Sequence, residues 1–402
     1  MNILFLSLLD MNSLNENNIY SDLLYELTCN GNYVYAVSPL ERRNKKKTFL
    51  IEGENYKILR NRILNIQKTN LIEKGLSTLL IEKNTIKAIK KYFKGVKFDL
   101  ILYATPPVTF SGVVKYFKKR DNAKSYLLLK DIFPQNCVDI GLFSNKSIFY
   151  KFFRRKEKKL YAVSDRIGCM SPNNVKYLLA HNDLSGKVVE VCPNSLKVED
   201  LSVSEQEKIT IRRQYNIPED KIVIFYGGNL GKPQGINFFV ESIKNCVDSR
   251  FFFLVVGGGT ESHVIEKYIA SENPENLKYF PFMPKNEYLK LTSASDIGLV
   301  LLDSRFTIPN FPSRSLDYMK AHLPLFCVTD ENCDLGDMAE LNDFGVKTLS
   351  DNVINFQKSL EKFCNIRDNI RMGENSYEYF RKNYDVKISC KKIMNFINGD
   401  KQ

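Results

Sequence analysis

Short runs rich in β-branched and aromatic residues alternate with amphipathic helical patterns along the whole chain, and this alternation limits the possible folds more than any other feature. Strands separated by helix-length segments pair in parallel through crossover helices. The expected strands of the first half are residues 3–9, 33–38, 100–104, 125–129, 167–171 and 188–192, and those of the second half are 222–226, 251–256, 277–280, 297–302 and 325–328. The sequence therefore predicts an α/β fold with two doubly wound parallel sheets.

Two domains are expected, because 402 residues exceed what one hydrophobic core usually supports. A polar segment without a strand pattern, from about Asn194 to Asp220, separates the two sets of strands. We place the boundary there, with an N-terminal domain at 1–195 and a C-terminal domain at 196–379. The amphipathic segment 377–397 could cross back, so residues from about 380 to 402 are assigned to the first domain. Two such domains place a ligand crevice between the carboxyl ends of their sheets.

The composition, 44% hydrophobic and 26% charged residues, is typical of a soluble globular protein. No apolar run approaches the ~20 residues of a membrane helix. The N-terminal MNILFLSLLD lacks a basic region and a cleavage site, so it is expected to be a buried strand rather than a signal peptide. Nine Cys without a CxxC pair indicate a reducing cytoplasm, and three His without a metal-ligand spacing predict no metal site.

The two halves of the chain differ in charge. Residues 1–200 contain 33 Lys and Arg against 19 Asp and Glu, a net charge of +14, whereas the remaining residues carry −2. Such a basic domain is expected to meet an acidic partner, for example a membrane surface, a lipid diphosphate or nucleic acid. A general surplus of surface lysine is the alternative.

The segment FPSRSLDYMKAHLPLFCVTD, residues 311–330, predicts a loop, an amphipathic helix starting near Ser313 and a buried strand. Ser313 is a good N-cap, and the first helical turn offers unpaired N–H groups and a partial positive charge, to which Arg314 adds a forked cation. Asp317, one turn further, can reach the same site. A cation suits a diphosphate and a carboxylate suits sugar hydroxyls, so a nucleotide-sugar site is predicted, with an ordinary capped helix as the alternative.

A glycine turn, IFYGGNLGKPQG, follows the expected strand 222–226. Gly227, Gly228 and Gly231 permit positive φ and close approach of a ligand, and Lys232 adds a charge suited to phosphate. The turn is not a P-loop, because GxxxxGK[ST] needs another residue and a hydroxyl after the lysine. A tight strand-to-helix turn without a ligand is the alternative. FLVVGGGTES, residues 253–262, lacks the third glycine and the later acid of a dinucleotide fingerprint, so it argues only weakly for a dehydrogenase.

The segment 311–330 and the glycine turn IFYGGNLGKPQG resemble the family 4 glycosyltransferases of the GT-B fold. The resemblance is to the N-acetylfucosaminyltransferase-like branch of bacterial surface-polysaccharide biosynthesis in particular. That branch has P-S-K-x-x-E-Y-M-x-x-G-x-P, and Pro312, Ser313, Arg314, Asp317, Tyr318, Met319 and Pro324 fill this pattern. Arg314 replaces Lys, Asp317 replaces Glu, and His322 stands in place of the usual Gly. The branch also has G-N-x-G-K-x-Q-G, matched by Gly228, Asn229, Gly231, Lys232, Gln234 and Gly235. The wider family has a second acid where this chain has Pro309, and Asn310 is the nearest polar residue.

The resemblance implies a GT-B enzyme with two Rossmann-like domains facing a central crevice, an N-terminal one for the acceptor and a C-terminal one for the nucleotide-sugar. It implies retaining transfer without a metal or cofactor from a UDP-sugar, with an N-acetylated hexosamine or deoxyhexosamine as the sugar. The acceptor would be linked to polyprenyl diphosphate or be an oligosaccharide of capsule, O-antigen or exopolysaccharide synthesis. Arg314 and Lys232 would bind the diphosphate and assist catalysis, and backbone groups of Phe282, Met283 and Pro284 would hold uracil.

In the first half, YLLLKDIFPQNCVDIG carries a strand that ends at Asp131. The same branch has a similar D-x-W/F-P stretch, which Asp131, Phe133 and Pro134 match, while the His that many relatives place before the Asp is Lys130 here. Asp131 could take a proton from the acceptor hydroxyl or orient the acceptor sugar, and it could equally cap the next helix.

FYKFFRRKEKKLY, residues 149–161, has six Lys or Arg and one Glu. As a helix it groups Phe149, Phe152, Phe153 and Leu160 near one face, which is typical of an interfacial helix on anionic lipid, and VKYFKKR, residues 114–120, repeats the pattern. The prediction is a cytoplasmic protein, peripheral on the inner face of the plasma membrane. A solvated helix whose aromatics enter the core is the alternative. No RRM, KH or zinc-finger signature supports nucleic acid.

Two other functions remain open on the sequence. One is a UDP-sugar 2-epimerase of the same fold, against which the small number of His counts. The other is a nucleotide-sugar-binding protein without chemistry, which the acid missing at Pro309 leaves possible.

Overall fold

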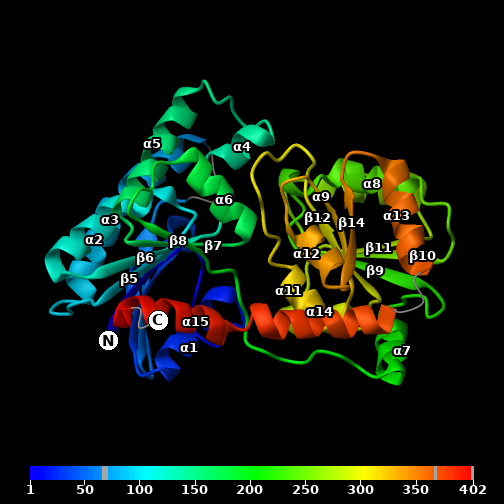
Figure 1. Cartoon of the computed structure of the whole chain (residues 1–402), viewed down its shortest axis with the longest axis horizontal. Coiled ribbons are helices and arrows are strands. Elements are labelled where there is room, and N and C mark those ends of the chain that lie inside the picture. Colours follow the sequence, from blue (N-terminus) through cyan, green and yellow to red (C-terminus); the bar gives the residue numbers. More distant parts are fainter. Residues whose placement is uncertain (66–70, 366–368, 400–402) are drawn as a thin grey trace. The chain divides into compact units, whose positions relative to one another are not determined.

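The computed structural model describes residues 1–65, 71–365 and 369–399 (Figure 1). The chain divides into two compact units, which we call unit 1 (Met1–Lys197 with Asp385–Gln402) and unit 2 (Val198–Tyr384). Each unit is built around its own sheet and its own hydrophobic core. Among the described residues no helix is both long and apolar enough to cross a membrane.

Unit 1 contains an eight-stranded sheet in the order β3-β4-β2-β1-β5-β6-β7-β8. All neighbouring strands are parallel except β3 and β4, which are antiparallel. Apart from that hairpin, the chain winds outward from β1 in both directions, as in a doubly wound sheet. The strands are β1 (Asn2–Leu6), β2 (Tyr33–Glu41), β3 (Phe49–Gly53), β4 (Tyr56–Ile63), β5 (Leu100–Ala104), β6 (Lys124–Leu129), β7 (Arg166–Cys169) and β8 (Val188–Val191).

The hairpin of β3 and β4 was not expected from the sequence. The middle of β4 contains Arg60, which is only 3% exposed although its residue type suggests a surface position. Its guanidinium donates to the Met11 carbonyl oxygen at 2.9 Å and pairs with Asp10, so it holds the loop that follows β1. A buried arginine of this kind hides the apolar pattern from which a strand would be predicted.

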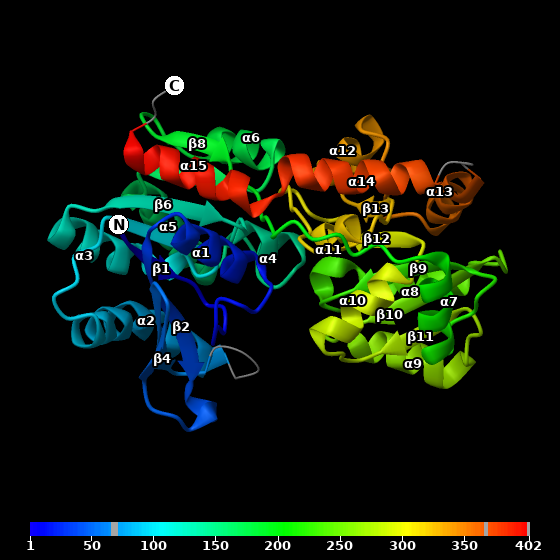
Figure 2. The same cartoon turned by 90° about the horizontal axis from the view of Figure 1, so that it is seen from below.

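Helices cover both faces of the unit 1 sheet (Figures 1 and 2). One face packs against α2 (Leu71–Tyr92), α3 (Ser111–Asp121), α5 (Ile148–Val163) and α6 (Pro172–His181). The other face packs against α1 (Ile19–Cys29) and α15 (Val386–Asn398), the last helix of the chain. The expected crossing back to the first sheet is therefore made by α15.

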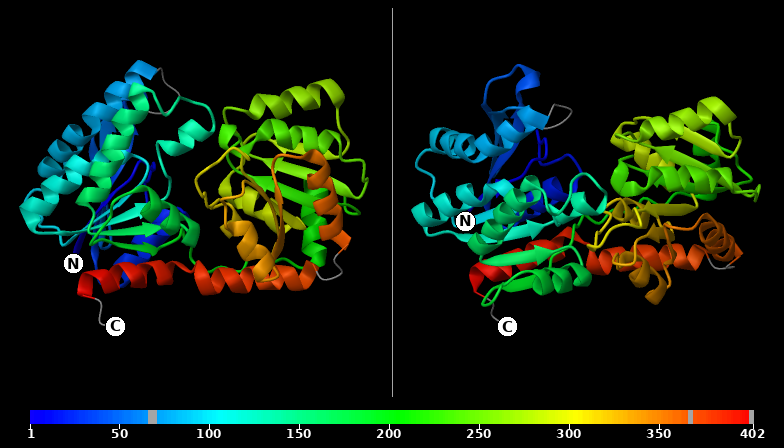
Figure 3. Two further views of the ribbon diagram at one scale, coloured as in Figure 1. Left: turned by 45° about the horizontal axis from the view of Figure 1, so that its top comes forward. Right: turned by 90° about the horizontal axis from the view of Figure 1, so that it is seen from above.

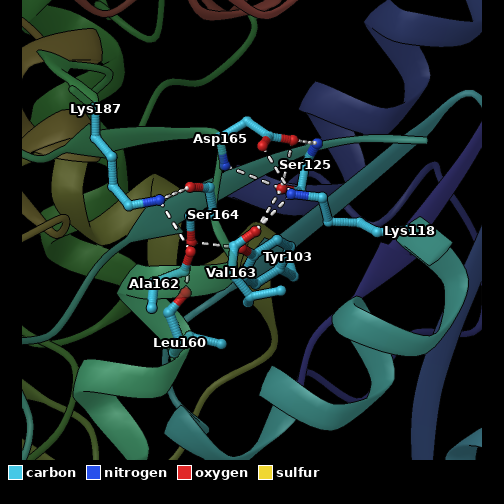
Figure 4. A network of polar contacts seen from close by, with 9 residues as sticks. All are labelled: Tyr103, Lys118, Ser125, Leu160, Ala162, Val163, Ser164, Asp165 and Lys187. Carbon is cyan, nitrogen blue, oxygen red and sulfur yellow. Dashed lines mark hydrogen bonds and ion pairs between the residues drawn. The ribbon is translucent and has the colours of Figure 1, made fainter. Parts of the chain in front are cut away.

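The C-terminal end of α5 is held by two lysines (Figure 4). Lys118 Nζ donates to the Val163 carbonyl oxygen and pairs with Asp165 Oδ1, both at 2.7 Å, and Lys187 Nζ donates to the Ser164 carbonyl oxygen, also at 2.7 Å. Cations placed there satisfy the last carbonyls and the negative end of the helix dipole. Burial lowers the pKa of Lys187. Lys118 therefore serves the fold rather than a free basic surface.

Three other residues of the segment VKYFKKR also contribute to the fold. Val114 and Phe117 are buried in the core, and Arg120 pairs with Asp121 and stacks over the Phe117 ring at 4.6 Å. Segment 114–120 therefore only partly has the predicted interfacial face, because Val114 and Phe117 pack inward whereas Tyr116 is 36% exposed.

Unit 2 contains a six-stranded sheet, parallel throughout, in the order β11-β10-β9-β12-β13-β14. This order is that of a Rossmann fold, with the switch point between β9 and β12. Every strand expected in this half is present, and the short edge strand β14 adds to them. The strands are β9 (Ile222–Gly227), β10 (Phe251–Val256), β11 (Leu277–Phe280), β12 (Ile297–Leu301), β13 (Leu325–Thr329) and β14 (Gly345–Leu349).

One face of the unit 2 sheet packs against α8 (Ile236–Lys244), α9 (Ser262–Glu272) and α13 (Val353–Asn365), drawn in green to orange in Figure 3. The other face carries α10 (Lys285–Ser293), α11 (Ser315–Lys320) and α12 (Leu335–Leu341). The remaining helices are α7 (Glu205–Gln214) and α14 (Asn369–Asn383). The segment 377–397, expected as one helix, is divided between α14 and α15, because Asp385 begins a new helix by accepting from the Lys387 N–H at 3.0 Å.

Candidate functional site

The glycine turn lies at the carboxyl end of β9, in the middle of the unit 2 sheet. A hydrogen bond to α11 fixes the first residue of the turn, because the Gly227 N–H donates to Tyr318 Oη at 2.8 Å. A side chain at Gly227 would collide with Tyr288, whose ring would lie 2.4 Å from the added Cβ. Gly228 follows with φ +124°, a conformation that side chains rarely adopt, and is exposed. The turn therefore presents bare backbone at the sheet edge where Rossmann-type folds bind ligands.

A second glycine turn supports the first. Gly257 and Gly259 follow β10, and a Cβ at Gly257 would lie 1.9 Å from the Gly228 carbonyl oxygen. A Cβ at Gly259 would lie 2.2 Å from the Leu230 carbonyl oxygen. The run GGG is thus explained by two backbones in contact, which agrees with the sequence-based rejection of a dinucleotide fingerprint.

Gln234 closes the first turn. Its Oε1 accepts from the Gly231 N–H at 3.1 Å and from Asn229 Nδ2 at 2.9 Å. These two side chains of the predicted donor site are bonded to each other, so their first role is to shape the loop. Lys232, on the same loop, is exposed, and its ammonium group has no hydrogen-bond or ion-pair partner among the described residues.

Arg314 lies against the glycine turn. A Cβ added to Gly228 would be 3.5 Å from Arg314 Cζ, and the guanidinium stacks on the Tyr226 ring at 4.6 Å. Arg314 Nη1 is shielded from water and lacks a hydrogen-bond partner among the described residues. Burial acts to lower the pKa of Arg314, but the phenol groups of Tyr226 and Tyr318 raise it overall. A charged group with an unused donor therefore faces exposed backbone, an arrangement suited to an anion.

The prediction that Ser313 caps the helix is wrong. α11 begins at Ser315, and its N-cap position is Arg314, which has helical φ and ψ and makes no side-chain capping hydrogen bond. Pro312 and Ser313 instead form a turn, in which the Ser315 and Leu316 N–H groups donate to their carbonyl oxygens at 3.1 and 3.2 Å. Two N–H groups at the N-terminus of α11 are therefore already paired. The Arg314 guanidinium is the main group that this end of the helix offers to an anion.

Asp317 lies on the same helix and is bound by a residue that sequence reasoning missed. Lys285 Nζ pairs with Asp317 Oδ2 at 2.6 Å, and Lys285 also lies over the Tyr288 ring at 5.1 Å. Lys285 follows FPFMP in the sequence, but nothing in the local pattern indicates that the start of α10 meets α11. A partner 32 positions away becomes visible only in the folded chain.

The loop before α10 contains the predicted uracil contacts. Phe282 is 83% exposed, Met283 is partly buried and Pro284 is exposed. The loop adjoins the second glycine turn, since a Cβ at Gly258 would be 3.2 Å from the Pro281 carbonyl oxygen. The structure thus brings the two glycine turns, Arg314 and this loop into one neighbourhood.

At Pro309, where the wider family has its second acid, this chain offers no carboxylate in its place. Asn310 Nδ2 donates to the Ile308 carbonyl oxygen at 3.4 Å, a long bond within its own loop. Across the described ranges, no three His, Cys, Asp or Glu side chains come together in a way that could hold a metal ion.

In unit 1, Asp131 follows β6 at the carboxyl edge of the sheet. Burial raises the pKa of its carboxyl group from 3.8 to about 6. Asp131 does not cap α4 (Gln135–Asp139), whose N-cap position is Pro134 and lacks a side-chain hydrogen bond, so that alternative is wrong. Burial is the main cause of the raised pKa of Tyr20, which lies at the start of α1. The charge of the nearby Asp131 raises this pKa further.

Lys130 lines a small pocket beside Asp131. Its Nζ donates to the Cys192 carbonyl oxygen at 3.3 Å, and burial lowers its pKa to about 8. The other lining residues are Ile19, Tyr20, Leu23, Leu128, Cys192, Pro193, Asn194, Ser195 and Ser389. Sequence reasoning treated Lys130 only as a departure from a family pattern, and its burial could not be foreseen from residue type.

Helix α5 only partly has the predicted apolar face. Phe153 packs on the Phe133 ring at 4.9 Å and Leu160 is fully buried, so these two residues belong to the core. Ile148, Phe149 and Phe152 are 80%, 65% and 37% exposed. The exposed basic residues of the helix are Lys151, Arg155, Lys158 and Lys159.

Arg154, in contrast, is fixed within the fold. It pairs with the buried Glu157, and its guanidinium donates to the His181 carbonyl oxygen at 2.8 Å, at the end of α6. The coupling to Glu157 raises the pKa of Arg154 although burial acts to lower it. Arg154 is therefore no part of a free basic surface.

Comparisons with known proteins agree with this geometry. Residues 207–381 match the family described as Glycosyl transferases group 1. The chain is 23% identical over 334 residues to the probable glycosyltransferase WbjE of Pseudomonas aeruginosa, covering 81% of this chain and 80% of that protein. It is 21% identical over 254 residues to the putative colanic acid biosynthesis glycosyl transferase WcaI of Escherichia coli K12, covering 61% and 60%.

Two solved structures have the same fold over almost their whole length. Sucrose-phosphate synthase from Thermosynechococcus elongatus matches with a TM-score of 0.77 at 15% identity, covering 99% of this chain and 98% of that one. Anabaena HepE, in complex with UDP and glucose, matches with a TM-score of 0.70 at 12% identity, covering 99% of both chains. The predicted GT-B class, with two parallel-sheet α/β domains, is confirmed.

The chain therefore carries a group 1 glycosyltransferase domain in unit 2, and it is a glycosyltransferase. The predicted resemblance and enzyme class are confirmed at this level. The match with transferases also disfavours the epimerase and the binding protein without chemistry.

Proposed function

We propose that this protein transfers a sugar, with retention, from a UDP-sugar to a lipid-diphosphate-linked or oligosaccharide acceptor in bacterial surface-polysaccharide synthesis. The observation that carries the proposal is the Arg314 guanidinium against the exposed backbone of Gly228. Support for the pathway comes from the relative WcaI, named for colanic acid biosynthesis, and support for UDP from HepE, solved with UDP and glucose. An N-acetylated hexosamine or deoxyhexosamine remains our proposal for the sugar.

The donor would bind to unit 2. In this proposal the diphosphate lies between Arg314 and Lys232 and over the turn Gly227, Gly228 and Gly231. The proposal is supported by the unused Arg314 donor and by the exposed Lys232 ammonium group on a loop that Gln234 holds closed. Asn229 and Gln234 would contribute by shaping this loop.

The remaining donor contacts follow from the neighbouring loops. Asp317 would accept hydrogen bonds from the ribose hydroxyls after Lys285, whose side chain is 45% exposed, has moved away. Backbone groups of Phe282 and Met283 would meet the uracil edge. Pro312 and Ser313 would fix the turn from which Arg314 projects.

The chemistry needs negative charge to be stabilised on the leaving diphosphate as the sugar bond breaks. Arg314 and Lys232 would supply this charge stabilisation where it is needed, without reorganisation during the reaction. We therefore propose that the reaction requires no divalent metal. Asp131 of unit 1 would orient the acceptor hydroxyl or take its proton, supported by a raised carboxyl pKa in the range useful for a base.

The membrane is proposed as a second partner. Ile148, Phe149 and Phe152 form an exposed apolar strip on α5, and the exposed cations Lys151, Arg155 and Lys159 lie on the same helix. Apolar and basic side chains together suit an anionic lipid surface. This would place the protein in the cytoplasm on the inner face of the plasma membrane.

The test is incubation with radiolabelled UDP-N-acetylhexosamines, with and without polyprenyl-diphosphate-linked acceptors and with EDTA present. We expect label to move to the acceptor only when the acceptor is present, with full activity in EDTA. Conversion of the UDP-sugar without an acceptor would indicate an epimerase, and binding without conversion would indicate a binding protein. Activity that EDTA abolishes and Mg²⁺ restores would contradict the metal-free mechanism.

A further inference from the structure

Tyr226 is the last residue of β9 that carries a side chain before the glycine turn. The side chain is fully buried, and its ring packs against the Phe239 ring of α8 with a centroid distance of 5.7 Å. Its hydroxyl group reaches the exposed Asn229, because Tyr226 Oη donates to the Asn229 carbonyl oxygen at 2.6 Å. One side chain therefore connects the core of unit 2 to the loop of the proposed donor site.

The Arg314 guanidinium lies on the same ring. Its Cζ is 4.6 Å from the centroid of the Tyr226 ring, and the face of an aromatic ring attracts a cation more strongly where water is excluded. Among the described residues no carboxylate forms an ion pair with Arg314, and Asp317 on the same helix pairs with Lys285 instead. An aromatic ring, and not an acid, therefore holds this cation.

A ring and a carboxylate hold a cation with different consequences for a ligand. A carboxylate would neutralise the guanidinium and would have to be displaced before an anion could bind, whereas the ring leaves the positive charge uncompensated. The phenol group is neutral, because burial raises the pKa of Tyr226 although the Arg314 charge acts to lower it. Arg314 Nη1 also has no hydrogen-bond partner among the described residues. Tyr226 thus fixes the cation and leaves its charge available to a diphosphate.

A second tyrosine of unit 2 has similar contacts away from the glycine turn. Tyr268 of α9 is 7% exposed, and Lys244 Nζ lies 5.1 Å from the centroid of its ring. Lys244 is in the last turn of α8, a helix that begins directly after the loop and therefore ends away from it. Tyr226 and Tyr268 belong to the same hydrophobic core, so substitutions at the two positions remove comparable packing but release different cations.

We propose that Tyr226 is a positioning residue for the donor site, whose ring holds the Arg314 guanidinium and whose hydroxyl group holds the loop at Asn229. A single buried side chain would thus set the distance between the cation of α11 and the loop that carries Lys232. Tyr226 itself makes no contact with the donor in this proposal. The role rests on the proposed function, because it is defined by the diphosphate that Arg314 and the loop would bind.

The experiment measures UDP binding by equilibrium dialysis with radiolabelled UDP for the wild type, Tyr226→Phe, Tyr226→Leu and the control Tyr268→Leu. Tyr226→Phe keeps the ring and loses the hydrogen bond to Asn229, so UDP should bind about threefold more weakly than to the wild type. Tyr226→Leu also loses the ring, and UDP should bind about tenfold more weakly than to Tyr226→Phe. Tyr268→Leu should bind UDP as the wild type does.

A double-mutant cycle separates this role from a loss of packing. The two Tyr226 variants are measured again together with Arg314→Ala. In that background the difference between Tyr226→Phe and Tyr226→Leu should disappear, because the ring acts through Arg314. Thermal unfolding checks that each protein is folded at the temperature of the assay. Tyr226→Met replaces Tyr226→Leu if the latter does not fold, since methionine fills irregular gaps in a core.

The proposal is overturned if Tyr226→Leu binds UDP as tightly as the wild type, or if the ratio of the two Tyr226 variants is the same with and without Arg314. If Arg314→Ala alone still weakens UDP binding, the proposed donor site stands and only the role of Tyr226 fails. If the wild type does not bind UDP, the proposed donor site fails together with this role.

Discussion

At Asp131, burial raises the pKa of the carboxyl group from 3.8 to about 6. A raised carboxyl pKa means that the folded state disfavours the charged form, so the cost of that charge is fully present above pH 6 and absent below the unfolded value near 3.8. Asp131→Asn should therefore stabilise the protein by about 1–3 kcal/mol at pH 7.5, and by less at pH 5. Urea unfolding at the two pH values measures this directly.

The same variant should lose transfer activity, because Asn cannot accept a proton and holds the acceptor hydroxyl less strongly. The wild type should lose activity as pH falls through about 6, where Asp131 becomes protonated. A variant that is less stable than the wild type at pH 7.5, or that keeps its activity, would show that Asp131 is a structural residue.

Asp317 supplies a second prediction at this scale. Asp317→Asn keeps the shape of the side chain but loses the charged acceptor for ribose hydroxyls, so UDP and the UDP-sugar should weaken together, by about tenfold. Lys285→Met is the matched control, since it removes the 2.6 Å ion pair and leaves the carboxylate. It should bind UDP as well as the wild type or slightly better. Weakening of the sugar part alone would assign Asp317 to the transferred sugar instead.

The positions of single residues were predictable from sequence where a residue type is unusual next to a strand. The proximity of Arg314 to the glycine turn after β9 was predictable from sequence, because a cation and flexible backbone after a strand indicate one anion-binding neighbourhood. Lys285 and Lys130 could not be identified in this way, because each depends on a contact or on burial that residue type does not indicate. The Ser313 cap failed because a turn centred on Pro312 and Ser313 delays the start of α11 to Ser315.

Among the elements, the two glycine turns, after β9 and after β10, form one structure. Gly257→Ala would place a Cβ 1.9 Å from the Gly228 carbonyl oxygen, at a residue with φ +146°, so the first turn must shift. We expect UDP affinity to fall by at least tenfold although Gly257 binds no ligand in our proposal. Gly258→Ala, whose Cβ would meet only the Pro281 carbonyl oxygen at 3.2 Å, is the control and should lose much less. Equal affinities of both variants would contradict this coupling.

Helix α5 carries the prediction about the membrane. The variant Lys151→Glu, Arg155→Glu and Lys159→Glu reverses exposed charges next to the apolar strip, and each basic residue near an anionic surface is worth about 1 kcal/mol. Sedimentation with anionic vesicles at low salt should be lost, while transfer to a short soluble acceptor continues. Arg154 is left unchanged because its pair with Glu157 supports the fold.

The control reverses three exposed lysines, namely Lys83 and Lys87 on α2 and Lys94 just after that helix. It changes the net charge equally, so it should still sediment if α5 is the binding surface. Loss of vesicle binding in both variants would mean that total charge, rather than α5, is responsible.

Elements were predicted best where they are buried on both faces. All strands expected from apolar runs are present, since central parallel strands read as continuous hydrophobic segments. The three strands that were missed lie at or near sheet edges, namely β3, β4 and β14. Their patterns are interrupted by polar residues such as the buried Arg60, whose partners lie in a distant loop.

At the scale of the whole molecule, the strand order of unit 2 places the carboxyl end of β9 beside the switch point, where Rossmann-type folds bind their ligands. The division between the units lies at Lys197 and Val198, and again at Tyr384 and Asp385. The alternation of strands and helices was sufficient to predict this fold class. The break between α14 and α15 was not predictable, because the amphipathic pattern continues across it.

The central claim is that Arg314 and the glycine turn of unit 2 bind the diphosphate of a UDP-sugar. The most direct measurement is the UDP affinity, by calorimetry, of the wild type, Arg314→Ala and Arg250→Ala. Arg250 is a matched control because it also stacks on an aromatic ring, Phe251 at 5.5 Å, but precedes β10 at the opposite edge of the sheet. Removal of a charge-assisted contact of roughly 1.5–3 kcal/mol should weaken UDP at least tenfold in Arg314→Ala, without a lower unfolding temperature, and Arg250→Ala should bind as the wild type does. An Arg314→Ala protein that binds UDP with wild-type affinity would contradict the account.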